Sequence, residues 1–410
     1  MLGSPQRIPD SRRATMIQCA PMSPLPRQSF LPIAAVLLLV LAGIFGPSLW
    51  QHYLGALARR SAPLYAPRER VTGGDEPSAP RVAPQLEQLE PQGLEEAARY
   101  AAEHGTRALI VARHDHIVFE RYWQGTDFDT VSDAQGFTPL LAVLATGIAI
   151  QHRRIGWPDE PLGLLLPEWS TDPRGAITVR NLLQQSSGLT AQDGLNDAPD
   201  LSAAALGSML GAPPGTLHLV QPVDAQLLAL VLQRATRQRY ADYLSAALWR
   251  RLGAADAWLW LDRAGGMAHA DCCMFARQGD WIRVGQMLAR DGSYRGAQVL
   301  RPGWVEFMRI PAKSDPDFGT LVRLALHPLP GSGAEGYASA DTFVVGGRGG
   351  NRLWIVPSLQ LAILATGDAR GRDAQWDDAH VPNLIMRSAR DYLPPAARPG
   401  ADLSTIVPGH

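Results

Sequence analysis

The chain has 410 residues, enough for one large domain or two ordinary ones. Hydrophobic residues make up 46% and charged residues 19% of it, which excludes disorder as the main state. The 38 basic and 39 acidic residues leave no basic excess to neutralise phosphates, so a nucleic-acid partner is not expected. Three cysteines exclude a disulfide scaffold, and no pair has zinc-ligand spacing.

The first predicted element is an apolar segment at residues 30–50. No charge lies between Arg27 and Arg59, which is long enough to cross a hydrocarbon core of about 30 Å. A cleaved signal peptide is the alternative, although the Ala-Leu-Ala sequence at 56–58 lies far beyond the end of the apolar run. We therefore predict a single transmembrane anchor at 30–50 after an N-terminal tail at 1–29. Arginines flank the segment on both sides, so the positive-inside rule does not fix its orientation.

A tether, a helix and a hairpin are predicted next. Residues 51–92 are rich in Pro, Glu and Gln, which is typical of a tether. Acidic residues after Leu94 and a glycine at 105 predict a helix between them. The patterns at 108–112 and 117–123 predict strands joined by a turn that contains His114 and His116. No further ligand is evident near these two histidines, so we interpret them as polar residues flanking the turn and not as a metal site.

The middle third of the chain reads as helical and its end returns to strands. Apolar periodicity predicts helices at 140–151, 225–236, 239–251 and 281–290, and strands at 342–345, 352–356 and 361–366. This order predicts an α+β domain over 93–397, in which N- and C-terminal strands meet in one antiparallel sheet packed with a helical subdomain. A short tail at 398–410 follows.

The order and spacing of several phrases carry a family resemblance. They read ALIVARHDHIVFERYW, TGIAIQHRRIGWPDEPLGLLLPEW, ITVRNLLQQSSGL, PGT, RYADYLSAALWRRLGA, CCMFARQGDWIRVGQMLARDG, VLRPGWV and RLWIVPSLQLAILATG. The chain resembles, over about residues 90–395, the serine β-lactamase and penicillin-binding-protein superfamily, in particular its class C and esterase-like branch with amino-oligomer hydrolases. The resemblance implies a β-lactamase/DD-peptidase-like fold and a nucleophilic serine in a Ser-x-x-Lys motif, aided by a Tyr-x-Asn loop and a Lys-Thr-Gly or His-x-Gly strand.

The first motif of that family is missing. Counting back from the family-like run at 146–150 places the nucleophile position on Gly136 and the lysine position on Pro139. Lys313 is the single lysine in the chain, and the residue three positions before it is Ile310. No Ser-x-x-Lys therefore exists under any alignment, and neither a nucleophile nor a base remains at these positions.

The other two motifs are also altered. Counting on from the Pro-Gly-Thr at 214–216 places the tyrosine position on Val220 and the asparagine position on Pro222. Arg348 stands where the third motif has its lysine or histidine. We predict a wider and less polar cleft in which Arg348 binds an anion or a carboxylate; an ordinary solvated arginine is the alternative. The surrounding glycines lead into strands, which excludes a phosphate loop.

Several remaining groups have structural interpretations. Thr138 and Ser132 are the hydroxyls nearest to the lost nucleophile and are the fallback nucleophiles. The Ser-Ser-Gly at 186–188 matches a structural turn of the family. Cys272 and Cys273 are interpreted as a buried thiol pair or a vicinal disulfide, and the acid at 280 as the cap of the next helix.

These observations predict a membrane-anchored pseudoenzyme with the serine hydrolase fold, in the bacterial inner membrane with its soluble domain in the periplasm. It would bind a small acyl, peptide or cell-wall-derived ligand or an envelope protein partner, without a cofactor or a metal. One alternative is an esterase, amidase or β-lactamase-like acyltransferase with an atypical nucleophile. The other is a structural subunit of an envelope complex, in which the helical face and not the cleft matters.

Overall fold

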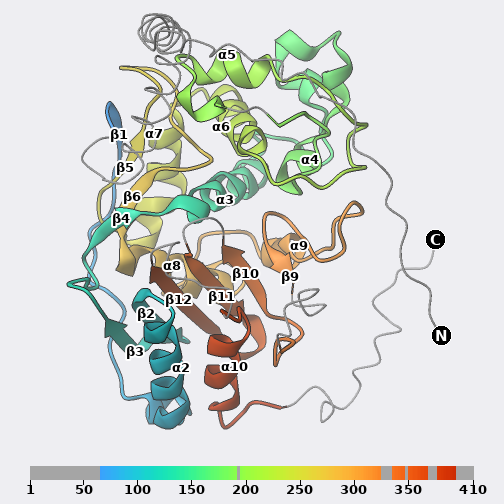
Figure 1. The fold of residues 1–410 in the computed structure, drawn as a ribbon. Helices are drawn as coiled ribbons and strands as arrows, with labels where there is room; N and C mark the ends of the chain where they lie inside the picture. The colour runs from blue at the N-terminus through green and yellow to red at the C-terminus, as the bar shows by residue number, and fades with distance from the viewer. Residues whose placement is uncertain (1–64, 192–193, 325–334, 347–349, 368–375, 394–410) are drawn as a thin grey trace, which may run out of the picture. The chain divides into compact units, whose positions relative to one another are not determined.

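Two segments far apart in the chain meet in one antiparallel sheet (Figure 1). The computed structural model describes residues 65–191, 194–324, 335–346, 350–367 and 376–393. The sheet has the order β3-β2-β12-β11-β10-β9, formed by His116–Tyr122, Thr106–Arg113, Leu361–Gly367, Arg352–Val356, Phe343–Gly346 and Arg323–Leu324. Because β12 pairs with β2, the predicted α+β fold closed by N- and C-terminal strands is confirmed.

Helices cover both faces of this sheet. Alternate residues of β2 point to opposite sides, so Leu109 and Val111 belong to one apolar cluster and Ile110 and Ala112 to another. The first cluster is shared with α2 (Pro91–Glu103) and α10 (His380–Arg387), and α8 (Gln278–Ala289) packs against the other face. The continuous apolar run in β2 follows from this burial on both faces.

A second sheet has four short strands in the order β1-β5-β6-β4. They are Arg68–Val71, Ala257–Trp260, Met274–Arg277 and Val131–Asp133. Here the structure differs from the sequence prediction, which placed residues 68–71 in the tether and no strands at 131–133, 257–260 or 274–277. The side chains of Val71 and Tyr65 are buried, so this part of the chain packs onto the domain.

The remaining helices share one apolar cluster with the face of the main sheet that α8 covers. They are α3 (Thr138–Gln151), α4 (Val179–Leu183), α5 (Leu201–Leu206), α6 (Pro222–Thr236), α7 (Tyr240–Leu244) and α9 (Trp304–Met308). After α7 the chain continues through a π-helical turn at Ser245–Trp249 and a 3-10 turn at Arg250–Leu252, and a short hairpin joins β7 (Ser293–Tyr294) to β8 (Ala297–Gln298). Helix α3 is buried along nearly its whole length and packs against α6.

Two further predictions concern the membrane anchor and the helix cap at Asp280. Among the residues that the structure describes, no helix is long and apolar enough to cross a membrane, and the predicted anchor at 30–50 lies outside them. Asp280 does not cap a helix as predicted. It lies inside α8, where its carboxylate accepts a hydrogen bond from the backbone N–H of Ala255 at 3.1 Å, and burial raises its pKa to about 6.

Candidate functional site

The two residues that the sequence predicts at the nucleophile and lysine positions of the family lie at the entrance to α3. Gly136 is half-buried in a 3-10 turn at Gln135–Phe137 that leads directly into this helix. Pro139 is the second residue of α3, where a proline is tolerated because the first N–H groups of a helix lack intrahelical partners. Neither residue has a group that can attack a carbonyl carbon or accept a proton.

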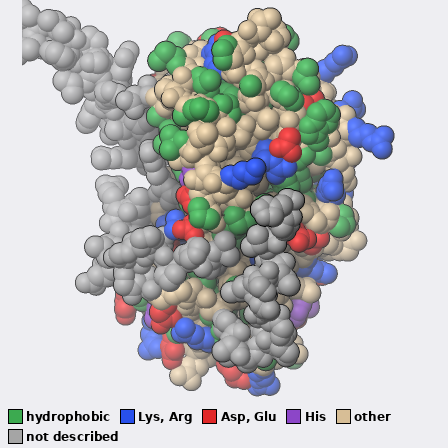
Figure 2. All heavy atoms as spheres, turned by 90° about the vertical axis from the view of Figure 1, so that its right-hand side faces the viewer, with side chains coloured by type: hydrophobic (Ala, Val, Ile, Leu, Met, Phe, Trp, Pro, Cys, Tyr) green, Lys and Arg blue, Asp and Glu red, His purple; other side chains and the backbone are tan. Residues whose placement is uncertain are grey.

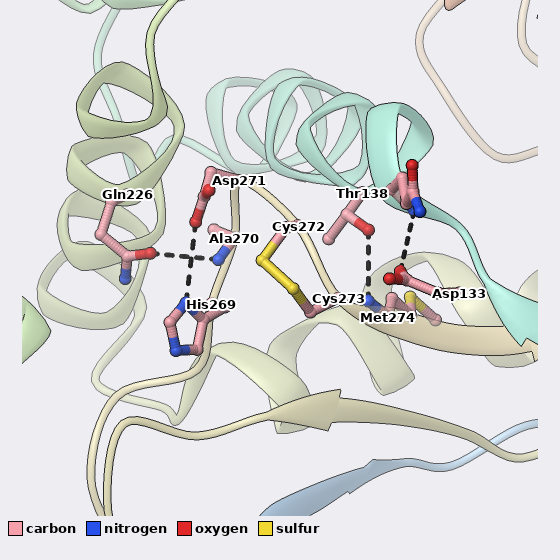
Figure 3. The surroundings of a disulfide bond; sticks show 10 residues. Asp133, Thr138, Gln226, His269, Ala270, Asp271, Cys272, Cys273 and Met274 are labelled. Carbon is pink, nitrogen blue, oxygen red and sulfur yellow. Dashed lines mark hydrogen bonds and ion pairs between the residues drawn. A yellow bond between two sulfur atoms is a disulfide. The ribbon is translucent and has the colours of Figure 1, made fainter. Parts of the chain in front are cut away.

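Each of the two fallback hydroxyls accepts a hydrogen bond from an amide group. The Thr138 side chain is fully buried, and its Oγ1 accepts a hydrogen bond from the backbone N–H of Met274 at 3.3 Å (Figure 3). Ser132 lies on β4, and its Oγ accepts a hydrogen bond from Nε2 of Gln278 at 2.9 Å. Both donors are amide groups, which cannot act as the general base that a hydroxyl nucleophile needs.

Backbone hydrogen bonds hold the loop that the sequence predicts as the second motif. Val220 is 66% exposed, whereas the neighbouring Gln221 is buried. The backbone N–H of Leu219 donates to the carbonyl of Gln185 at 2.8 Å, and the N–H of Gln221 donates to Oε1 of the same residue at 3.1 Å. Pro222 begins α6. The loop is therefore held in place while an apolar side chain faces solvent at the tyrosine position.

The Ser-Ser-Gly turn at 186–188 contains a buried polar pair. The hydroxyl of Ser187 donates to Oδ1 of Asp224 at 2.6 Å, and Nε2 of Gln221 donates to Oγ of Ser187 at 3.2 Å. Burial raises the pKa of Asp224 to about 7. Ser187 and Asp224 are 1% and 0% exposed, so no substrate reaches them, in agreement with the structural interpretation of this turn.

The third motif is described only at its edges, because Arg348 lies outside the described residues. Strands β10 and β11 flank the glycine-rich run, as the exclusion of a phosphate loop requires. After it, Asn351 is buried and donates from Nδ2 to the carbonyl of Ala134 at 3.4 Å, while its Oδ1 accepts from the N–H of Gly367 at 3.3 Å. Asn351 therefore joins the sheet edge to the segment that carries Gly136.

A histidine-carboxylate contact in this region has no precedent in the sequence prediction. Nδ1 of His218 lies 3.1 Å from Oδ2 of Asp315, and the imidazole packs on the ring of Phe318 with 4.3 Å between centroids. Burial lowers the pKa of His218. The contact joins the second-motif loop to the loop after α9. His218 and Asp315 are 97 residues apart in the chain, so no local sequence pattern could predict their contact.

The two histidines of the predicted turn, His114 and His116, share the carboxylate of Glu87. His114 contacts Glu87, and Nδ1 of His116 lies 2.6 Å from Oε1 of the same residue. The pair lies at the β2–β3 turn.

Exposed apolar side chains surround the second-motif loop. We call them the apolar rim: Met209, Leu210, Leu217, Leu219 and Val220, which are 36–70% exposed. The backbone N–H of Thr190 donates to the carbonyl of Met209 at 2.8 Å, and the N–H of Leu219 donates to the carbonyl of Gln185 at 2.8 Å, so both ends of the rim are fastened to the segment around the Ser-Ser-Gly turn. Hydrophobic side chains are also spread over the upper, helical half of the face in Figure 2.

Together, the two-faced sheet and a buried helix starting beside its edge define the class of β-lactamase-like and DD-peptidase-like serine hydrolase folds. The beta-lactamase family profile matches residues 92–380, and the chain belongs to this family. The 6-aminohexanoate-dimer hydrolase of Paenarthrobacter ureafaciens is 27% identical over 223 residues, which are 49% of this chain and 56% of that protein. The chain thus matches little more than half the length of this relative.

Two solved structures show the same fold. A protein from Bacillus anthracis named after the same dimer hydrolase superposes with a TM-score of 0.61 and 16% identity, over 80% of this chain and 90% of its own. A penicillin-binding-protein homologue from Caulobacter crescentus gives a TM-score of 0.58 and 14% identity, over 73% and 98% of the two chains. Both are similar in fold, and their sequences are too distant to carry residue roles.

Proposed function

We propose that this protein is a catalytically inactive member of the β-lactamase family that acts by binding a ligand or a partner. The observation that carries the proposal is the pair Gly136 and Pro139 at the start of α3, in a chain without any Ser-x-x-Lys. The hydrogen bonds of Thr138 and Ser132 support it, because each hydroxyl oxygen is oriented by an amide and not by a base.

The apolar rim supports a ligand with an apolar part. Exposed apolar side chains gathered in one place are typical of binding surfaces in soluble domains. Val220 replaces a phenol that would be polar, so the change of motif itself adds to the rim. We infer that an acyl or peptide group, such as a cell-wall-derived fragment, packs on the rim, and that an envelope protein is the alternative occupant.

The membrane setting is part of the same proposal. The uncharged stretch between Arg27 and Arg59 supports an anchor at 30–50 in the bacterial inner membrane. The domain would then be held in the periplasm, where cell-wall fragments and envelope proteins are its available partners.

The test is the intact mass of the full-length chain after incubation with fluorophosphonate and penicillin probes. We expect no mass gain, in a sample that melts cooperatively and is therefore folded. The P. ureafaciens dimer hydrolase, treated in parallel, serves as the reference. A stoichiometric adduct on any residue near the start of α3 would overturn the proposal, and peptide mapping would name the nucleophile.

A hydrolase with an atypical nucleophile is the second candidate, because the curated relative is named for hydrolysis. It requires turnover of an ester or an amide that saturates with substrate. Thr138→Ala or Ser132→Ala would abolish this turnover if the hydroxyl in question were the nucleophile. Turnover unchanged in both variants would exclude these two residues.

A further inference from the structure

The loop between β5 and β6 brings three metal-ligating side chains together. One atom each from His269, Asp271 and Cys272 lies within 4.8 Å of the other two. An imidazole nitrogen, a carboxylate oxygen and a thiolate sulfur are all ligands that Zn²⁺ takes in proteins. Figure 3 shows His269 and Asp271 facing one another, with the cysteine pair beside them.

The imidazole of His269 is buried with both nitrogens unsatisfied. Its side chain is 0% exposed and stacks on Trp260, with 4.0 Å between ring centroids and 7° between planes. Within the described part of the chain, neither ring nitrogen has a hydrogen-bond partner, and the same holds for the buried Oδ1 of Asp271. Buried polar groups normally have partners. This orphaned imidazole is the second, independent indication of a ligand.

The separation of these groups suits a bridging ion. Nδ1 of His269 lies 3.8 Å from Oδ1 of Asp271, too far for a hydrogen bond. Ligands at about 2.0–2.3 Å from a tetrahedral Zn²⁺ are themselves roughly 3.3–3.8 Å apart.

One of the three candidate ligands, the sulfur of Cys272, is part of a disulfide. Cys272 is bonded to Cys273, and a disulfide sulfur lacks the negative charge of a thiolate ligand. A dithiol reductant supplies two electrons and two protons: its S–H bonds break, the Cys272–Cys273 bond is cleaved to two thiols, and the reductant becomes a disulfide. Cys272 then loses its proton to solvent when a metal binds.

We propose that His269, Asp271 and Cys272 form a Zn²⁺ site that the Cys272–Cys273 disulfide keeps closed and that reduction opens. The site adjoins the degenerate motif: the backbone of Met274, the next residue after the pair, donates to Thr138 and accepts from the N–H of Ala134 at 2.8 Å. The proposal does not depend on the absence of catalysis, since it rests on this loop alone.

The test compares oxidised and reduced full-length protein that carries Cys19→Ser, so that the pair supplies the only thiols. The dithiol reductant is removed anaerobically before Zn²⁺ is titrated against a chromophoric chelator. We expect one Zn²⁺ per reduced chain, bound at least about 100-fold more tightly than by the oxidised chain. Co²⁺ in place of Zn²⁺ should show thiolate-to-metal charge transfer in the near ultraviolet. Equal affinity in the two redox states would overturn the proposal.

Two matched variants identify the sulfur ligand. Cys273→Ala and Cys272→Ala each remove one thiol and abolish the disulfide. We expect Cys273→Ala to bind Zn²⁺ without any reductant, and Cys272→Ala and His269→Ala to lose the charge-transfer band or the tight binding. Equal binding by the two cysteine variants would contradict the assignment. The redox comparison changes none of the proposed ligands, so it decides the question even where one of these variants fails to fold.

Discussion

Among the carboxyl groups near the degenerate motifs, that of Asp224 has the most strongly raised pKa. Its carboxyl group is fully buried, and its Oδ2 has no hydrogen-bond partner within the described ranges. Burial raises its pKa from an ordinary 3.8 to about 7. The folded protein therefore holds this proton more tightly than the unfolded chain does. The resulting stabilisation is complete below about pH 4 and is lost as the pH rises through about 7.

Asp224→Asn removes this titration while keeping the shape of the side chain. Its carbonyl can still accept from Ser187, and its NH₂ replaces an oxygen that already lacks a partner. We expect the variant to match the parent at pH 5 and to exceed it by about 1–2 kcal/mol in unfolding free energy at pH 8, because the parent alone buries a charge there. Urea denaturation at the two pH values measures both.

The difference between parent and variant isolates Asp224 from Asp133 and Asp280. Burial raises the pKa of each of these to about 6, so they add to the pH dependence of both proteins equally. A loss of stability of the same size at pH 5 and pH 8 would contradict the prediction. It would mean that the native state depends on a carboxylate at this position and not on a neutral acid.

At the scale of elements, α3 is positioned by a close approach to α9. A Cβ atom added at Gly147 would overlap the ring of Trp304, which is itself buried. Gly147→Ala should gain up to about 1 kcal/mol of helix propensity but lose about 1–3 kcal/mol to overpacking. We therefore expect net destabilisation, measured as a lower midpoint of urea denaturation.

A double-mutant cycle tests whether the contact is responsible. Trp304→Leu shortens the side chain and should be destabilising alone, because a large buried ring is lost. Combined with Gly147→Ala, it should be less destabilising than the sum of the two by about 0.5 kcal/mol or more. Additive effects would show that the glycine is required for a reason other than Trp304.

The elements that the sequence predicts most clearly are continuous apolar runs. The apolar helix at 140–151 and the strands at 108–112 and 361–366 each extend over several residues of one pattern, and all three are present. Strands of the second sheet have three or four residues, too few to distinguish a period of two from a loop. Of the two states predicted for Cys272 and Cys273, the structure contains the vicinal disulfide.

The candidate site residues also differ in whether the sequence alone could predict them. Gly136 and Pro139 are assigned to the first motif by counting from a family-like run, which stays a prediction, and the structure places both at the start of α3. The contact of His218 with Asp315 could not be predicted, since it depends on tertiary packing between two loops. His269 and Asp271 are close in sequence, but only their burial without partners distinguishes them from ordinary polar residues in a loop.

At the scale of the whole molecule, the two ends of the described domain are fastened together. Arg113 is 1% exposed and donates from Nε to the carbonyl of Leu359 at 3.2 Å and from Nη1 to the carbonyl of Glu87 at 2.8 Å. It also pairs with Asp391 near the last described residue. Ahead of α2, Tyr65 is the first residue that the structure describes, and its side chain is already buried in the domain.

This arrangement leads to a prediction about the membrane. A chain that begins at Ser61 retains Tyr65 and β1, so it should remain soluble and melt cooperatively. The full chain should sediment with membranes and resist extraction at alkaline pH, because residues 31–45 contain no charge. Leu38→Arg should weaken insertion by roughly 2.5–3.5 kcal/mol and move protein to the soluble fraction. Leu38→Ile is the matched control.

Intact mass separates the two interpretations of the apolar segment at 30–50. The full mass in the membrane fraction supports a retained anchor, whereas a soluble product shortened before Ser61 would establish a cleaved signal peptide.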